Sequence, residues 1–211
     1  MTKKERARAA VEQLKLMYPD PECSLEAQNP YQLLVATRLS AQCTDARVNL
    51  VTPALFAAFP TPEAMSKAPV EEVEELIRST GFYRTKARDL VIMAQQLLDR
   101  FDGNVPDNIE DLTSLQGVGR KTANLICGDI YHIPGSVVTD THLIRIANRI
   151  GLVETKDPKK VELELRNLLP PEESNNFCHR CVMHGRACCT ARKAHCENCA
   201  LTEICKKKIA K

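Results

Sequence analysis

Tryptophan is absent from this 211-residue sequence, and the aromatic fraction is only 4%. Because 44% of the residues are hydrophobic, the predicted core is built mainly from aliphatic side chains. The sequence also lacks any run of about 18 apolar residues, so no membrane-spanning helix is predicted. The first ten residues, MTKKERARAA, are charged and lack the apolar segment of a secretory signal. We therefore expect a cytoplasmic protein that does not bind membranes.

Alternating apolar and polar residues, the pattern typical of strands, are scarce, and Val137-Val138 is the only short hint of it. Signals for helices recur instead. Thr2 and Glu5 have the spacing of a capping box, and Asn29-Pro30 is typical of a helix start. Helices of roughly 8–18 residues joined by short turns predict an all-α protein. The connection HIPGSVV, at 132–138, is the candidate boundary between two helical lobes.

Positive charge and cysteine are concentrated near the C-terminus. The net charge is only +2, but residues 171–211 contain eight Lys or Arg against four Glu. This excess is a weak indication of an anionic partner. The ten cysteines, without a predicted secretory signal, are interpreted as reduced thiols or metal ligands rather than as disulfides.

The segment LQGVGRKTANLIC, at 115–127, predicts a hairpin between two helices. Residues 108–115 have the pattern of a short helix, residues 116–119 of a tight turn, and residues 120–131 of the next helix. Backbone N–H groups of Gly117, Val118 and Gly119, with the N-terminus of the second helix, would form a seat for a phosphate. The hairpin alone is equally typical of an ordinary helix-packing unit.

Lys121 lies in the first turn of that second helix, where the partial positive charge of a helix N-terminus disfavours a cation. Either an anion binds there, or the lysine benefits from being hard to protonate. Asp140, further along the chain, is a typical N-cap residue. The helix after it would bury Leu143, Ile146, Ala147 and Ile150, and its polar face would carry His142, Arg145 and Arg149.

Four cysteines near the C-terminus have the spacing C-x6-C-x2-C-x5-C. Four thiolates this close in sequence can converge on one centre, and the spacing alone is compatible with zinc or with an iron–sulfur cluster. The six-residue loop inside the motif contains Arg192 and Lys193, which we expect to point outward toward a phosphate backbone. Cys188 is adjacent to the first cysteine of the motif and complicates the assignment of ligands.

Together these segments resemble the endonuclease III family of helix–hairpin–helix DNA glycosylases. The resemblance covers nearly the whole chain, and Lys121 favours the branch with both glycosylase and lyase activities. It rests on LSAQCTD at 39–45, LQGVGRKTAN at 115–124, PGSVVTDTH at 134–142, HGR at 184–186 and the four-cysteine loop.

The resemblance implies one helical lobe at 22–132, containing the hairpin, and a second at 1–21 plus 133–211. Double-stranded DNA with damaged bases or abasic sites would lie in the cleft between them, and the damaged nucleotide would be flipped out of the stack. We expect a monomer associated with the nucleoid through DNA. A [4Fe-4S] cluster would be held by Cys189, Cys196, Cys199 and Cys205.

The implied activity is removal of oxidised pyrimidines followed by β-elimination at the abasic site. Lys121 would attack C1′ and form a Schiff base, and Asp140 would assist by proton transfer and by stabilising positive charge on the sugar. Gln42 would fill the gap left by the flipped base, and the residue at 82 would wedge from the opposite side. The predicted DNA contacts are Gln42, Phe82, Gly117, Val118, Gly119, Arg120, His142, Arg145, Arg192 and Lys193.

Three positions depart from the usual pattern of the family. Gln116 stands where proline is frequent, Phe82 where leucine is common, and Thr139 where valine is usual. Two alternative functions remain beside the leading one. The first is a glycosylase of the same fold for uracil or thymine in mismatches, and the second is a non-catalytic protein that binds damaged DNA. An electron carrier is less compatible with the phosphate-binding hairpin.

Overall fold

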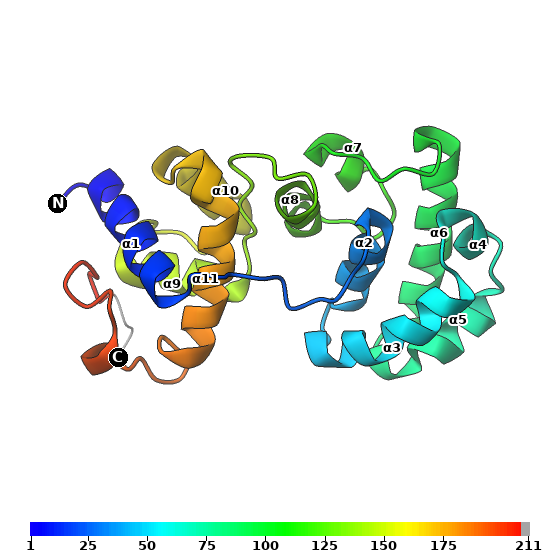
Figure 1. The fold of residues 1–211 in the computed structure, drawn as a ribbon, viewed down its shortest axis with the longest axis horizontal. Helices are drawn as coiled ribbons and strands as arrows, with labels where there is room; N and C mark the ends of the chain where they lie inside the picture. Colours follow the sequence, from blue (N-terminus) through cyan, green and yellow to red (C-terminus); the bar gives the residue numbers. More distant parts are fainter. Residues whose placement is uncertain (208–211) are drawn as a thin grey trace. The chain divides into compact units, whose positions relative to one another are not determined.

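The computed structural model describes residues 1–207, and in this range the chain forms helices and no β-strand (Figure 1). The prediction of an all-α protein is confirmed. No helix within the described range is long and apolar enough to span a membrane. The α-helices are α1 (Lys3–Met17), α2 (Pro30–Leu39), α3 (Asp45–Ala58), α4 (Pro62–Ser66), α5 (Val70–Ile77), α6 (Tyr83–Phe101), α7 (Ile109–Thr113), α8 (Arg120–Asp129), α9 (Thr141–Ile150), α10 (Pro158–Leu168) and α11 (Ser174–Ala187). The short 3₁₀ helices are η1 (Arg78–Thr80), η2 (Pro171–Glu173) and η3 (Cys196–Asn198).

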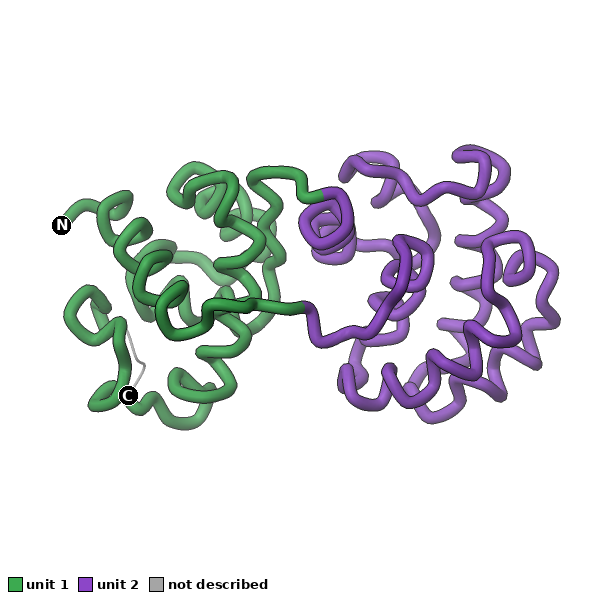
Figure 2. Tube along the Cα trace, in the orientation of Figure 1, with its two compact units in different colours: residues 1–22, 132–211 green, residues 23–131 purple. Residues whose placement is uncertain are grey.

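The chain divides into two compact units, shown in different colours in Figure 2. Unit 1 contains residues 1–22 and 132–211, and unit 2 contains residues 23–131. The predicted lobes span 22–132 and 1–21 plus 133–211; residues 208–211 of the second lobe lie outside the described part of the chain. Unit 1 is therefore built from both ends of the sequence, and unit 2 is one continuous segment.

Unit 2 is organised around its longest helix, α6, which packs against α2, α4 and α5. The side chains of Leu90, Met93 and Leu97 on α6 are fully buried, as the aliphatic composition predicts. The short helix α7 and helix α2 both pack against α8. The start of α8 is thereby fixed by two neighbouring helices of the same unit.

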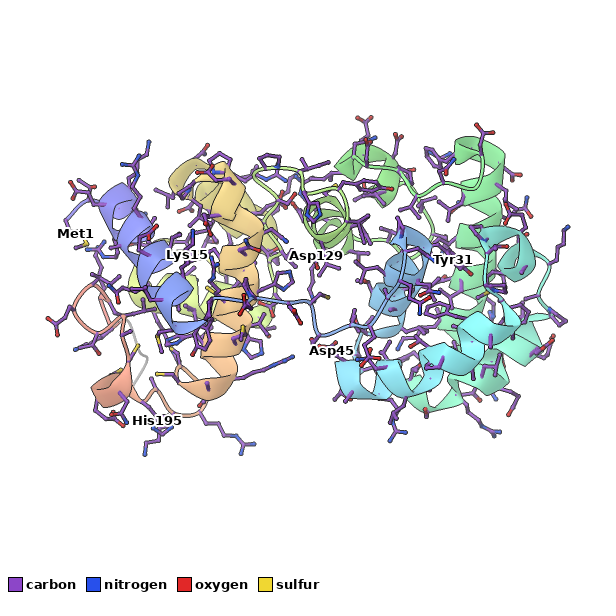
Figure 3. The ribbon with its side chains drawn as sticks, viewed as in Figure 1. Met1, Lys15, Tyr31, Asp45, Asp129 and His195 are labelled. Atoms are coloured by element: carbon purple, nitrogen blue, oxygen red, sulfur yellow. The ribbon has the colours of Figure 1, made fainter. Side chains whose placement is uncertain are left out.

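In unit 1, α11 packs against both α9 and α1, and α1 also contacts α10. Cationic side chains connect the N-terminal helix to the C-terminal part. Arg6 donates from Nε to the carbonyl oxygen of Ile204 at 2.9 Å, and Lys15, labelled in Figure 3, pairs with Glu173 at 2.6 Å. Arg180, which is nearly buried, donates to Tyr18 O at 3.1 Å and to the same glutamate at 2.7 Å. These contacts explain how segments far apart in sequence form one unit.

Seven of the eleven α-helices in the described range begin at a polar residue whose side chain caps their free N–H groups. The predicted capping box at Thr2 and Glu5 is present, with both of its hydrogen bonds. Helices α5, α6, α8 and α11 have no side-chain cap. The side-chain caps are Thr2, Asn29, Thr44, Thr61, Asn108, Asp140 and Asp157.

The predicted helix ends differ from the structure by one or two residues. The helix predicted over 108–115 spans Ile109–Thr113, with Asn108 as its cap, and the helix predicted over 120–131 ends at Asp129. Val137 and Val138, the only hint of a strand, are buried in an extended connection that pairs with no other strand in the described range. Their apolar character reflects burial rather than pairing in a sheet.

Candidate functional site

The hairpin between α7 and α8 has the predicted tight turn. Gly117 has a φ of +74°, a conformation that disfavours side chains, and Gly119 occupies the N-cap of α8 without a side-chain hydrogen bond. The N–H of Val118 donates to the carbonyl oxygen of Leu115 at 3.2 Å, and the valine side chain is buried. Of the three turn residues, Val118 is thus used to hold the turn itself. The first N–H groups of α8 receive no side-chain cap.

A partly buried ion pair between α2 and α6 lies against this turn. Arg38 of α2 donates from Nε to Asp89 of α6 at 2.9 Å, and its Nη2 forms a second, shorter contact with the same carboxylate oxygen. A Cβ atom on Gly117 would lie only 2.6 Å from Nε of Arg38. The glycine is therefore required both by the backbone angle and by the close approach of the arginine.

Gln116 takes part in the same network. Its side-chain amide donates to Oδ1 of Asp89 at 2.9 Å, and its backbone N–H donates to the side-chain oxygen of Gln96 at 2.7 Å. Proline, the residue frequent at this position in the family, has no N–H and could make neither bond. The departure at 116 therefore replaces a rigid ring by two hydrogen bonds.

Lys121 occupies the second position of α8, and its side chain is exposed. Arg120, immediately before it, is half-buried, and its carbonyl oxygen accepts a hydrogen bond from the amide of Asn124 at 3.1 Å. The apolar spacing of this segment predicts a buried stripe of Ala123, Ile126, Cys127 and Ile130. The first three are buried, whereas Ile130, which follows the end of α8, is half-buried. The helix thus packs through that stripe and leaves the lysine on its solvent side.

Two further positions of unit 2 have unusual backbones. Gln42, in the turn after α2, has a φ of +52°, and Phe82, at the start of α6, has a φ of +50°. Both side chains are exposed, and Phe82 is 67% exposed despite being aromatic. Both residues line one surface pocket, together with Arg38 and Lys86. A bulky side chain on a left-handed backbone indicates strain that functional sites often retain.

In unit 1, the connection from residue 134 to residue 140 places Asp140 at the start of α9. Gly135, with a φ of +81°, donates its N–H to Pro171 O at 2.7 Å, and Val138 donates to Sγ of Cys178 at 3.3 Å. Thr139 is buried. Asp140 accepts the N–H of Leu143 at 2.7 Å, so the predicted cap is present. The four predicted core residues of α9 are all buried.

The polar face of α9 contacts the cysteine-rich loop. Arg145 donates to Cys189 O at 3.0 and 3.2 Å and to Gly185 O at 3.1 Å, and its Nη2 lies 3.1 Å from Nδ1 of His142. Arg149 reaches Thr190 O at 2.7 Å and the sulfur of Cys189 at 3.2 Å. Both guanidinium groups hold the loop to the helix. The DNA contacts predicted for His142 and Arg145 therefore involve side chains that already have partners in this unit.

The loop itself wraps around an apolar pocket. Cys189 forms an antiparallel bridge with Ala194, and Thr190 donates to Lys193 O at 2.6 Å. Arg192 and Lys193 are exposed, as predicted, and the loop also contains His195 (Figure 3). The space in this pocket, counted together with its opening to solvent, is about 390 Å³. Its lining includes all four predicted ligands, Cys189, Cys196, Cys199 and Cys205, with Ile146, Ile150 and Leu201.

Two more possible ligands, His184 and Cys188, line this pocket. The sequence pattern indicates Cys188 as a competing ligand but does not identify His184. The nearest ligand atoms of His184, Cys188 and Cys199 all lie within 4.8 Å of one another. Burial lowers the pKa of His184, whose Nε2 is 3.5 Å from Sγ of Cys199. Burial raises the pKa of the Cys199 thiol to about 11 and also raises the pKa of Cys188 and Cys205. A raised pKa keeps a thiol protonated at neutral pH, and a metal that binds there would displace the proton.

The predicted residues thus fall into three groups. Unit 2 contains the hairpin with Lys121, and also the pocket lined by Gln42 and Phe82; unit 1 contains Asp140 together with the arginine-bound cysteine loop. Sequence patterns did not identify the supporting residues Arg38, Lys86 and Asp89. The sequence offered one signal for these residues, which is a charged side chain on a helix face that is otherwise apolar.

Comparison with known proteins gives concordant results over nearly the whole chain. The model for the HhH-GPD superfamily, whose members are base excision DNA repair proteins, matches residues 35–171. The chain is 46% identical to the endonuclease III of Synechocystis sp., over 97% of this chain and 93% of that protein. It is 38% identical to the endonuclease III of Bacillus subtilis, over 90% and 87% of the two chains.

Solved structures give the same result. A trapped covalent intermediate of an endonuclease III with DNA superposes with a TM-score of 0.91 at 39% identity, covering 98% of this chain and 97% of that chain. A thermostable thymine-DNA glycosylase superposes with a TM-score of 0.86 at 20% identity, which indicates a shared fold.

Proposed function

The chain belongs to the endonuclease III family of the HhH-GPD base excision repair proteins, and we propose that Lys121 and Asp140 carry its chemistry. The protein is a DNA N-glycosylase and abasic-site lyase that acts on damaged DNA and removes oxidised pyrimidines. The proposal concerns which side chains of this sequence perform each step. The observation that carries it is an exposed lysine at the uncapped start of α8.

Lys121 is proposed as the nucleophile. A lysine attacks only as a neutral amine, because the ammonium form has no lone pair to form the new bond. The amine nitrogen bonds to C1′ of the sugar, and the damaged base leaves with the electrons of the glycosidic bond and takes up a proton. Opening of the sugar ring then gives a Schiff base. Removal of a proton from C2′ then breaks the bond between C3′ and its oxygen, and the 3′ phosphate leaves with the electron pair. This step is β-elimination.

Asp140 is proposed to assist these proton transfers and to stabilise positive charge developing on the sugar. One of its oxygens accepts the N–H of Leu143, so the carboxylate is fixed in orientation by the helix that it caps. A carboxylate has four lone-pair positions, and one hydrogen bond leaves acceptor capacity for a substrate proton. The residue thus combines a structural and a chemical role.

The hairpin is proposed to bind a DNA phosphate. Gly119 has open space where a Cβ would lie, so a phosphate can approach the backbone closely. Its contact, with those of Gly117 and Arg120, would fix the position of the strand without reading its sequence. The N–H of Val118 is not available for this contact because it already donates to Leu115 O. Gln42 and Phe82 are proposed to enter the stack where the flipped nucleotide leaves. Arg192 and Lys193 would contact the backbone from the cysteine loop.

Cys189, Cys196, Cys199 and Cys205 fit an iron–sulfur centre, and we propose that they hold a [4Fe-4S] cluster. Their four thiols line a single apolar pocket, and Arg149 donates to the sulfur of Cys189, a position that suits a thiolate. A bound cluster would link the four cysteines covalently and so cross-link the loop that contains them. The measurement is iron, sulfide and zinc content: iron and sulfide in equal amounts support the proposal, and stoichiometric zinc without iron contradicts it.

The nucleophile is tested by borohydride reduction with abasic-site DNA. Wild-type protein should form a covalent complex, because reduction makes the Schiff base permanent. A Lys121→Gln variant should bind the same DNA and form none. Equal trapping by the variant would show that another amine reacts. A panel of duplexes with oxidised pyrimidines, uracil or mismatched thymine then defines the damaged base, and preferential removal of uracil would replace the oxidised-pyrimidine assignment.

A further inference from the structure

Lys86 is the most unusual side chain of unit 2. It lies one turn into α6, is only 1% exposed, and is among the largest fully buried side chains in the described part of the chain. Its ammonium group donates to the carbonyl oxygens of Leu39 and Thr80, both at 2.7 Å. Burial lowers the pKa of this lysine. Lysine is almost never buried without a defined partner, because removing its charge from water is costly.

The two acceptors share a structural position. Leu39 is the last residue of α2, and Thr80 is the last residue of η1. The final carbonyl groups of a helix have no partner inside it, and they carry partial negative charge that favours a cation. Lys86 thus closes two helix ends at once.

The chain continues from these two ends into two strained turns. Residues 40–43 form the turn that contains Gln42, with Cys43 donating to Ser40 O at 3.1 Å. Gly81 and Phe82 follow Thr80, and a Cβ on Gly81 would lie 4.0 Å from Gln42 O. The turns are therefore adjacent. Non-glycine residues with positive φ persist only where surrounding contacts hold them, and Lys86 supplies contacts to both turns.

We propose that Lys86 is a positioning residue that fixes Gln42 and Phe82 as one rigid unit for insertion into the DNA stack. This inference rests on the proposed roles of those two side chains. An apolar residue would fill the same space at lower desolvation cost, but it could not join the two helix ends. Lys86 needs no contact with DNA, and its effect passes through the two turns.

The test uses Lys86→Met, which retains the length of the side chain and removes its donors. Two readouts are compared at a temperature where the variant is folded. The first is the single-turnover rate of excision from a duplex with an oxidised pyrimidine. The second is the fluorescence of 2-aminopurine placed opposite the lesion, in the Lys121→Gln background, where binding occurs without chemistry. We expect about a tenfold loss of rate and a clearly smaller fluorescence gain, since neighbouring contacts couple strongly.

A double-mutant cycle separates positioning from general stability. If Lys86 acts through the turns, Lys86→Met should change the rate less than about twofold in a Gln42→Ala, Phe82→Ala background. The matched control is Leu90→Ala, which removes a buried side chain one turn further along α6. It should lower the Tm but leave both readouts near wild type. If Lys86→Met lowers the rate about tenfold in the Gln42→Ala, Phe82→Ala background as well, the proposal is overturned. It is also overturned if Lys86→Met and Leu90→Ala give the same values in both readouts.

A second variant covers the case in which Lys86→Met does not fold. Lys86→Gln retains one donor group and should give a smaller loss in both readouts; wild-type behaviour would contradict the proposal. Failure of the proposed function is recognised separately. In that case the wild-type protein itself would show no excision and no borohydride-trapped complex. If only this inference fails, the wild-type protein is active and the Lys86 variants are as active as the wild type.

Discussion

Helices α8 and α9 carry the two proposed chemical groups at their N-termini, yet the two starts are built in opposite ways. Helix α8 begins at Gly119, which has no side chain to cap it, and presents an exposed lysine in its first turn. Helix α9 begins at Asp140, whose carboxylate accepts the N–H of Leu143 at 2.7 Å. One helix start has no side-chain cap, and the other is capped by a carboxylate of the chain itself.

The difference shows how one physical property serves two purposes. Partial positive charge at a helix start attracts a phosphate if no cap competes, and it orients a carboxylate if one is present. The predictions below alter one helix start at a time.

The largest effect is expected for Asp140→Asn. Asparagine caps a helix about as well as aspartate, so α9 should stay folded while the charge is lost. We expect the single-turnover excision rate to fall about a hundredfold or more, the usual range for removal of a proton-transfer group. The control is Asp157→Asn, which makes the same change at the cap of α10, where the carboxylate accepts from Lys160 at 2.8 Å. Unchanged activity of Asp140→Asn would show that Asp140 takes no part in the reaction.

Gly117→Ala should have the second-largest effect, through the hairpin. The alanine Cβ would lie 2.6 Å from Nε of Arg38 on a backbone with a φ of +74°. Overpacking and strain together should lower the free energy of unfolding by about 2 kcal/mol, measured by urea denaturation. The control is Gly119→Ala, where nothing lies within 4 Å of the added carbon. Glycine is a better N-cap than alanine, so we expect a smaller loss of about 0.5–1 kcal/mol. Equal destabilisation by both would contradict the described turn.

A smaller effect separates the two roles of Asp140. Asp140→Ala removes both the charge and the cap, whereas Asp140→Asn removes only the charge. The alanine variant should therefore be less stable than the asparagine variant by about 1 kcal/mol, the usual contribution of a side-chain cap. Thermal unfolding of the two proteins measures this difference. Identical stabilities would show that the hydrogen bond to Leu143 contributes nothing.

The smallest effect is expected for Gly119→Ser, which adds a cap to α8 and makes it resemble α9. The site has open space for the side chain, and the φ of −94° suits serine. Stability should rise by a few tenths of a kcal/mol, while affinity for abasic-site DNA should fall by roughly threefold because the hydroxyl competes with the phosphate. Fluorescence anisotropy measures the affinity. Tighter DNA binding would argue against the open helix start as a phosphate site.

Sequence periodicity predicted the local structure of these helices well. Leu143, Ile146, Ala147 and Ile150 form the buried face of α9 as predicted, because an amphipathic helix in a small unit has one apolar stripe. The ends of α7 and α8 were less predictable, since frayed helix ends depend on tertiary contacts. The strand suggested by Val137 and Val138 is absent from the described part of the chain. Valine also occurs at buried positions outside strands, so these two residues do not distinguish the two cases.

The supporting polar contacts were beyond sequence patterns. Arg145 was predicted on a polar face as a DNA contact, but its partners His142, Gly185 and Cys189 come from segments up to 44 residues away. Lys86 lies on the buried face of α6, and its two acceptors are known only from the fold. Long-range partners of a charged side chain depend on topology, which residue spacing does not encode.

The central claim is that the amine at the open start of α8 attacks the sugar. The most direct measurement is mass spectrometry of wild-type protein trapped on abasic-site DNA with borohydride and then digested. The reduced sugar adduct should be found on Lys121, at the junction between the hairpin and α8. An adduct on another lysine or on the N-terminal amine, with Lys121 unmodified, would contradict the account.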